Sequence, residues 1–280
     1  MEIVIAVLAG LGGILVGGVL NALADDLPTR ARVSLPRYPG GSPRPPAAWL
    51  GLSAFVLGKR QGPPVTLTNP AEEASSSPPR ANRLGWRHPL LELATGMAFA
   101  GLTLAFADEP ALWAWYVYVA ILLLITVIDL EHRLILFAVI LPSCVFALVV
   151  AILAPASGRT FSEYLLGGAM GFLLFFAMFL GGVAFSTLTR SSEVAFGFGD
   201  VMLATLSGLM LGWRAFIFAA LIAVFAGAAG AVLYMVGRTI VGRRYRRFTP
   251  LPYGPYIVLG TLVMLLFRQE VQDLLRSNYS

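Results

Sequence analysis

Long hydrophobic runs separated by short polar segments dominate the chain. Eight runs lie near residues 3–22, 89–107, 111–128, 134–154, 164–187, 200–213, 215–236 and 251–267. Most reach the ~17 to 25 apolar residues that a helix needs to cross a hydrocarbon core. The sixth run is short, and we expect it to be packed inside a bundle where lipid cannot reach its ends. The pattern predicts an all-α, polytopic membrane protein with about eight transmembrane helices.

The composition supports this interpretation and narrows the function classes. Of the 280 residues, 58% are hydrophobic and 12% are charged, whereas soluble domains carry about 25% charged residues. The single cysteine, Cys144, excludes an internal disulfide and a zinc site made of cysteines alone. We assign the net charge of +5 to membrane topology and expect no nucleic acid as a partner, because basic residues of membrane proteins gather in cytoplasmic loops.

The positions of the basic residues predict the orientation. With the N-terminus outside, the loops on the cytoplasmic side hold 16 of the 20 Lys and Arg residues. This asymmetry favours an N-out and C-out arrangement. The end of the third run, at Asp129, and the start of the sixth, at Asp200, then lie on the cytoplasmic side.

We expect three parts along the chain: a first transmembrane helix (1–22), a cytoplasmic loop (23–88) and a seven-helix core (89–280). The loop is rich in Pro, Gly and Ser and contains no cysteine, so we expect it to be largely irregular. Within it, Ala47 to Leu57 is an apolar island too short to span. It either lies at the membrane interface, where it would cap the site, or forms a local hydrophobic cluster.

Glycines four residues apart recur in the apolar runs. The pairs are Gly13 with Gly17, Gly167 with Gly171, and Gly208 with Gly212. Small residues at this spacing let membrane helices approach closely, so they predict a compact bundle.

Two aspartates at the ends of hydrophobic runs, Asp129 and Asp200, are the main candidates for chemistry. Ionisable residues in such places are costly and usually functional. Two carboxylates about 4 Å apart at an effective dielectric near 20 repel by roughly 4 kcal/mol, so one would stay protonated while the other is ionised. The ionised member can then draw a proton from water while the protonated member polarises a peptide carbonyl. Either aspartate alone would fit a solvated helix end equally well.

Further candidates lie near these aspartates in the sequence or at the start of the second run. Gly197 and Gly199 precede Asp200, where glycine allows a turn and lets a substrate strand come close. Glu92 and Glu193 are candidate substrate contacts. For both, the alternative is a structural charge, which for Glu92 the helix N-terminus would favour. No metal site is predicted, since no His-Glu-x-x-His motif is present.

These motifs together resemble the prepilin (type IV leader) peptidase family, within the Gly-x-Gly-Asp intramembrane aspartyl proteases. Five blocks carry the resemblance: Gly17–Asn21 with Leu27-Pro28, Arg87–Gly96, Asp129–Ile135, Glu193 with Gly197–Val201, and Pro252–Tyr256. The resemblance implies a multi-pass enzyme of the inner (cytoplasmic) membrane, in contact with membrane lipids. It would remove the leader peptide of type IV prepilin or pseudopilin precursors at the cytoplasmic face, with Asp129 and Asp200 as catalytic dyad and no cofactor for proteolysis.

Some family features are absent or altered. Many members also methylate the new N-terminus with S-adenosylmethionine; whether this chain does so is left open, because no cofactor motif is recognisable. Members often carry four zinc-binding cysteines in the first loop, where this chain has none. Leu136 and Phe137 follow Ile135 where members usually have Pro and an acidic or amide residue, and Met202 replaces a frequent Lys. These changes leave the dyad intact and bear on substrate contacts.

Two alternative functions are compatible with paired carboxylates. One is a protease of the same group that cleaves within transmembrane helices of other substrates, against which the blocks around Asn21, Pro89 and Pro255 argue. The other is an ion-coupled transporter that uses the carboxylates as a relay. Transporters place such groups near the bilayer midplane between repeats, whereas these aspartates are expected at the cytoplasmic edge.

Overall fold

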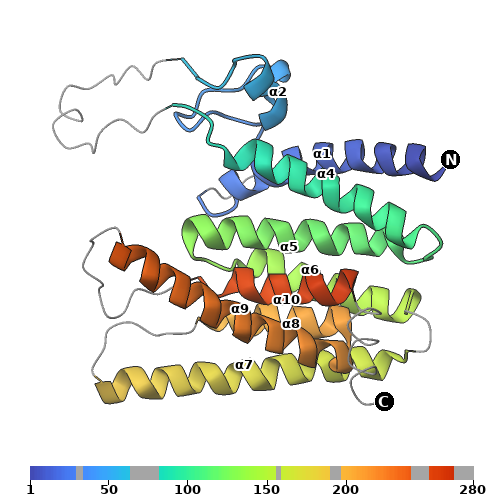
Figure 1. Cartoon of the computed structure of the whole chain (residues 1–280), viewed down its shortest axis with the longest axis vertical. Coiled ribbons are helices and arrows are strands. Elements are labelled where there is room, and N and C mark those ends of the chain that lie inside the picture. The colour runs from blue at the N-terminus through green and yellow to red at the C-terminus, as the bar shows by residue number, and fades with distance from the viewer. Residues whose placement is uncertain (30–33, 64–81, 156–158, 190–196, 241–251, 268–280) are drawn as a thin grey trace. The chain divides into compact units, whose positions relative to one another are not determined.

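The computed structural model describes residues 1–29, 34–63, 82–155, 159–189, 197–240 and 252–267, which form helices and no β-strand (Figure 1). The helices are α1 (Glu2–Asp26), η1 (Pro46–Ala48), α2 (Gly51–Val56), α4 (Arg87–Phe106), α5 (Leu112–His132), α6 (Phe137–Leu153), α7 (Phe161–Thr189), α8 (Phe198–Leu211), α9 (Trp213–Ile240) and α10 (Gly254–Leu266). The chain divides into two units, Met1–Leu124 and Ile125–Ser280. The predicted all-α class is confirmed.

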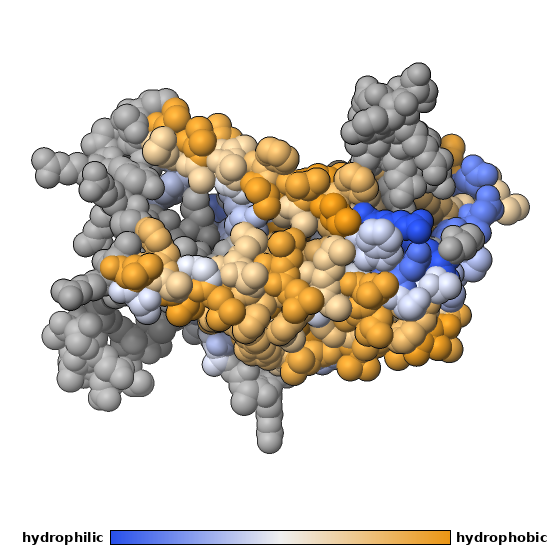
Figure 2. All heavy atoms as spheres, turned by 90° about the horizontal axis from the view of Figure 1, so that it is seen from below, coloured by the Kyte–Doolittle hydropathy of each residue, from blue (hydrophilic) through white to orange (hydrophobic). Residues whose placement is uncertain are grey.

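Every predicted hydrophobic run contains a helix. The helices α1, α4, α5, α7 and α9 are long and apolar enough to cross a membrane, while α6, α8 and α10 are shorter apolar helices. Figure 2 shows a face on which most of the coloured atoms belong to hydrophobic residues. Large apolar side chains such as Leu15, Leu173 and Phe225 are exposed on the long helices, as expected where lipid is the solvent. The chain is a multi-pass helical membrane protein; its exact number of spans and its orientation stay predictions.

Close backbone contact joins α1 and α4 in the first unit, as the Gly13 and Gly17 pair predicted (Figure 1). A Cβ atom on Gly13 would lie 2.7 Å from the Thr95 carbonyl oxygen, and one on Gly17 would lie 2.6 Å from Glu92 Cα. Any larger residue would push the two helices apart, so these glycines set the helix separation.

The 23–88 segment is less irregular in its described part than its composition predicted. There η1 and α2 pack around a cluster of buried residues consisting of Tyr38, Ala48, Ala54 and Leu84, with Phe55 packed against it. Two isolated β-bridges, from Arg37 to Pro43 and from Gln61 to Arg83, also hold this segment together. The apolar island therefore contributes to a local hydrophobic cluster, which was one of its two interpretations.

In the second unit, most residues of α8 from Asp200 to Leu211 are buried, while Phe198 at its start is exposed, and the helix packs against α6, α7, α9 and α10. The backbones of α7 and α8 touch at Gly167 and Gly208, and a Cβ on Gly171 would overlap the Ala204 carbonyl. The helix ends at Gly212, whose φ of 73° favours glycine. A helix that is hydrophobic all round belongs inside a bundle, so the prediction for the short sixth run is confirmed.

Candidate active site

Asp129 lies in the last turn of α5, just before the helix stops. Arg133 adopts a positive φ of 53° while its N–H still donates to the Asp129 carbonyl at 2.8 Å. The Asp129 carboxyl is buried beside the Gly254 backbone N–H. Among the described residues its Oδ2 atom has no hydrogen-bond partner. A Cβ on Gly254 would lie 2.5 Å from that oxygen, so glycine keeps this space open.

Asp200 is held at the start of α8 by a reciprocal cap with Gly197. The Asp200 N–H donates to the Gly197 carbonyl at 3.1 Å, and the Gly197 N–H donates to Asp200 Oδ2 at 3.2 Å. A carboxylate in the first helical turn also benefits from the positive end of the helix dipole. Gly197 therefore orients the aspartate as well as allowing the turn.

The structure brings both aspartates into the second unit. The Asp200 and Asp129 carboxyl groups are near enough to interact electrostatically. Ile135 lies between the elements that carry the site: its Cβ would be 2.8 Å from a Cβ on Gly199, and its Cδ1 3.4 Å from one on Gly254. The residues that follow the first aspartate therefore pack against the glycines of α8 and α10, and this packing joins the two motifs.

Two residues of the site, Tyr253 and Gly254, were not selected as site residues from the sequence. Gly254 contacts Asp129 as described, and the Tyr253 phenol interacts electrostatically with Asp200. The Tyr253 ring also fits against Gly227, where a Cβ would lie 2.7 Å from Cε2. Both residues belong to the block Pro252–Tyr256, which is the signal that could have found them.

Glu92 lies in the first unit and is completely buried. Its Oε1 accepts hydrogen bonds from the Gly51 N–H at 2.6 Å and from Asn21 Nδ2 at 3.2 Å. Its Oε2 accepts one from the Leu52 N–H at 2.8 Å. The carboxylate thus caps the first two amides of α2 and ties the loop to α1 and α4. The other predicted glutamate, Glu193, lies outside the described residues.

A charged cluster surrounds Asp25 at the end of α1. Its carboxylate contacts Arg87 Nη2 at 2.5 Å, Arg44 Nη2 at 3.4 Å and His88 Nε2 at 3.4 Å. Arg44 is buried, and its Nε donates to the Arg37 carbonyl at 2.7 Å. Buried charges are retained when they are paired in this way, so the cluster is a second tie between the loop and the helices.

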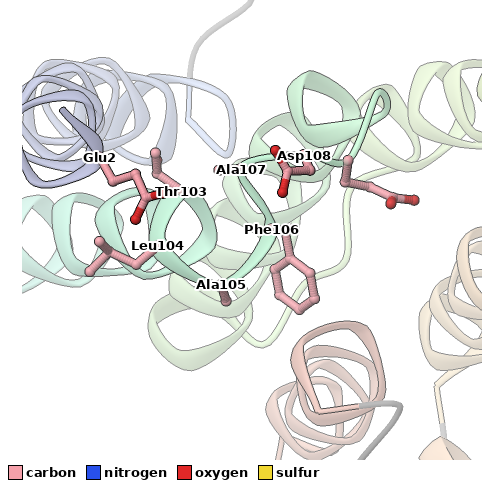
Figure 3. Close-up of a pocket in the computed structure, with 8 residues that line it drawn as sticks. Glu2, Thr103, Leu104, Ala105, Phe106, Ala107 and Asp108 are labelled. Carbon is pink, nitrogen blue, oxygen red and sulfur yellow. The ribbon is translucent and has the colours of Figure 1, made fainter.

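Two pockets formed by described residues contain neither aspartate of the pair. One lies where α1 begins and α4 turns toward α5, and Glu2, Thr103 and Asp108 line it (Figure 3). The other is an apolar groove on α7 and the start of α9, which includes Leu166 and Trp213. Neither holds the set of polar groups that would complete the carboxylate site.

The fold and the site define a polytopic helical membrane protein with paired carboxylates at the ends of two apolar helices. Residues 116–232, which include both aspartates, match the model of the type IV leader peptidase family. This segment is similar to that family, as the motif blocks predicted. No solved structure matches the chain.

Several curated relatives are named prepilin leader peptidase/N-methyltransferase. The protein of Burkholderia pseudomallei is 32% identical over 188 residues, which cover 66% of this chain and 56% of the relative. That of Myxococcus xanthus is 27% identical over 254 residues, or 86% of this chain and 67% of the relative. That of Aeromonas hydrophila is 25% identical over 193 residues, or 69% and 62%. The chain thus spans little more than half the length of the Burkholderia relative.

Proposed function

We propose that the protein is an aspartyl endopeptidase that removes the leader peptide from type IV prepilin or pseudopilin precursors. The observation that carries the proposal is the pairing of Asp129 and Asp200 within one unit. Among the described residues, Asp129 Oδ2 is buried and without a hydrogen-bond partner. A buried, unpaired carboxylate oxygen is costly. A water molecule would donate to it when it is ionised, and a substrate carbonyl would accept from it when it is protonated.

The chemistry needs one carboxyl group in each protonation state. The ionised carboxylate takes a proton from a water molecule while the oxygen of that water attacks the carbon of the peptide bond. The protonated carboxyl gives its proton to the carbonyl oxygen. When the C–N bond breaks, the carboxyl that took the water proton gives it to the departing amine. The diol returns one proton to the other carboxylate as the new C=O bond forms, so the dyad is again singly protonated. Repulsion between two carboxylates in a poorly solvated site supplies this division of roles.

The substrate is proposed to approach along the glycines. Gly197 is exposed beside Asp200 and Gly199 is half-buried against Ile135, and we retain both glycines and Glu193 as substrate contacts. The three hydrogen bonds of Glu92 favour support of the loop over direct contact with substrate. We propose the inner membrane as the location and its cytoplasmic side as the side of the reaction, as the distribution of basic residues favours.

The names of the relatives support N-methylation. Neither of the two pockets described above supports it by offering a binding site for S-adenosylmethionine. That cofactor carries an amino acid group, ribose hydroxyls and an adenine, which need several convergent polar partners. The groove at Leu166 and Trp213 is apolar, and the pocket at Glu2 lies on the predicted outer side. The two pockets described above do not fit the cofactor, so no methylation step is derived from them.

Co-expression of the chain with a type IV prepilin precursor, in a host without its own peptidase, tests the proposal. The unmodified chain should convert the precursor to the shorter mature form, whereas Asp129→Asn and Asp200→Asn should not. Asp108→Asn, at an exposed aspartate in the turn after α4, is the matched control and should cleave normally. Normal leader removal by either dyad variant would overturn the proposal. Mass analysis of the mature N-terminus shows whether a methyl group is added.

Cysteine labelling tests the proposed side of the membrane. Leu130→Cys and Phe198→Cys, each in a Cys144→Ala background, place a thiol at exposed positions beside the aspartates. A membrane-impermeant reagent should react with them in inverted vesicles and not in intact cells. Reaction from outside would reverse the predicted orientation.

A further inference from the structure

A buried polar contact links α8 and α10, and the proposed chemistry does not use it. Ser207 and Thr261 are both fully buried, and Thr261 Oγ1 lies 2.8 Å from Ser207 Oγ. The Ser207 O–H donates to the Leu203 carbonyl at 2.9 Å, so its oxygen accepts from Thr261. Thr261 has one hydroxyl proton and two acceptors within reach, which are Ser207 Oγ on α8 and the Ile257 carbonyl on α10. The Ile257 carbonyl oxygen lies 2.8 Å from Thr261 Oγ1.

The contact occurs at matched depth in the two helices that carry the site. Ser207 lies seven residues after Asp200, and Thr261 lies seven residues after Gly254, whose amide faces Asp129. Seven residues correspond to about 10.5 Å along a helix. The helices α8 and α10 pack against each other. A slide of either helix would therefore break this hydrogen bond and shift Asp200 relative to the Gly254–Asp129 contact by the same amount.

The Tyr253 ring seated on Gly227 helps to hold α10 against α9, whereas the glycine contacts of α8 with α7 and of α10 with α9 fix separation more than axial position. Gly208 touches the Gly167 backbone, and Gly260 touches the Ala219 carbonyl. Such contacts between smooth backbones limit how closely helices approach. A hydrogen bond between two hydroxyl groups also requires a heavy-atom distance of about 2.5–3.0 Å and a directed geometry, and so resists sliding.

We propose that the Ser207–Thr261 hydrogen bond sets the axial register of α8 against α10 and thereby positions Asp200 opposite Asp129. Ser207 and Thr261 are then positioning residues for the reaction, since neither touches the reacting atoms. The inference rests on the proposed function for its catalytic consequence. Its geometric consequence can be measured without any cleavage.

The matched variants are Thr261→Val and Thr205→Val. Both remove one hydroxyl from a buried or half-buried threonine without changing its shape, and both break a 2.8 Å bond to the carbonyl four residues earlier. Only Thr261 also bonds across helices in the described contacts. Thr261→Val should lower kcat for leader cleavage about tenfold, because small displacements of reacting groups are costly, while KM stays within about twofold. Thr205→Val should leave both constants within about twofold, and Thr261→Ser should restore kcat.

A distance measurement separates failure of this inference from failure of the proposed function. Spin labels on cysteines at Leu130 and Phe198, in a Cys144→Ala background, report the spacing of the ends of α5 and α8. Thr261→Val should shift or broaden the distance distribution, and Thr205→Val should not. If the unmodified chain cleaves no precursor, the proposed function fails while the labels still test the register. Equal kcat and equal distance distributions for the two valine variants would overturn the inference.

Discussion

Glu92 in the first unit and Asp129 in the second are both buried carboxylates in apolar helices, and their surroundings differ. The Glu92 oxygens accept three hydrogen bonds from Gly51, Leu52 and Asn21. The Asp129 Oδ2 atom accepts none within the described residues. A satisfied buried carboxylate holds its neighbours in place, whereas an unsatisfied one costs stability and must be retained for another reason. The three bonds of Glu92 mark it as a structural acid, whereas Asp129 Oδ2 keeps an open acceptor position beside the Gly254 amide.

The largest expected effect tests whether the second-unit carboxylates act together. Asp129→Asn and Asp200→Asn should each lower kcat/KM by at least about 10³-fold, and the double variant should lose little more, because groups that act as a unit are not additive. Their thermal unfolding midpoints should stay near that of the unmodified chain, since asparagine still offers an acceptor oxygen. Steady-state cleavage and thermal scans in detergent measure both. Losses that multiply in the double variant would contradict a shared site.

The next effect tests the open space beside Asp129. Gly254→Ala would place a methyl group 2.5 Å from Asp129 Oδ2, so we expect kcat to fall about ten- to hundredfold through displacement of the carboxyl. Gly181→Ala is the control, because a Cβ there meets nothing within 4 Å. Similar activity of the two variants would show that Oδ2 does not need this space.

Glu92→Gln tests the structural side of the comparison. A neutral amide cannot accept at both ends, so one of the α2 amides loses its partner and unfolding becomes easier by about 1–3 kcal/mol. We expect a lower unfolding midpoint and an unchanged kcat per folded molecule, with the exposed Glu2→Gln as control. A normal midpoint combined with a raised KM would instead support the substrate contact that the sequence predicted for Glu92.

The smallest effect concerns adjacent glycines of α1. Gly13→Ala would bring a Cβ to 2.7 Å from the Thr95 carbonyl oxygen, whereas a Cβ on Gly12 meets nothing within 4 Å. Gly13→Ala should destabilise the protein by about 1–2 kcal/mol through overpacking. Gly12→Ala should be neutral or slightly stabilising, because alanine is the better helix former. Equal unfolding midpoints would show that the α1–α4 spacing is not set at Gly13.

The helices were predictable because a run of apolar residues in a membrane has few other conformations open to it. The burial of α8 followed from its length, and the candidate site at Asp129 and Asp200 was proposed from two charges next to apolar runs. These inferences use local patterns only.

Long-range contacts were not predictable from local patterns. The order of the loop depends on Glu92 reaching the amides of Gly51 and Leu52, some forty positions earlier in the chain. Gly254 reaches Asp129 across an even larger separation. A composition rich in Pro and Gly does not reveal such partners, which explains why the loop was expected to be more irregular than its described part is.

Under the proposed function, the shortness of α8 would also set how deep in the membrane the reaction takes place. At 14 residues the helix is about 21 Å long, against a hydrocarbon thickness of about 30 Å. Its far end is tied to Arg159, whose Nη1 donates to the Leu211 carbonyl at 2.5 Å, and arginine side chains favour the membrane surface. With Arg159 at one membrane surface, the predicted topology places Asp200 several ångströms below the opposite surface. The proposed function would then require a precursor to bring its scissile bond beneath the lipid headgroups and water to reach it there.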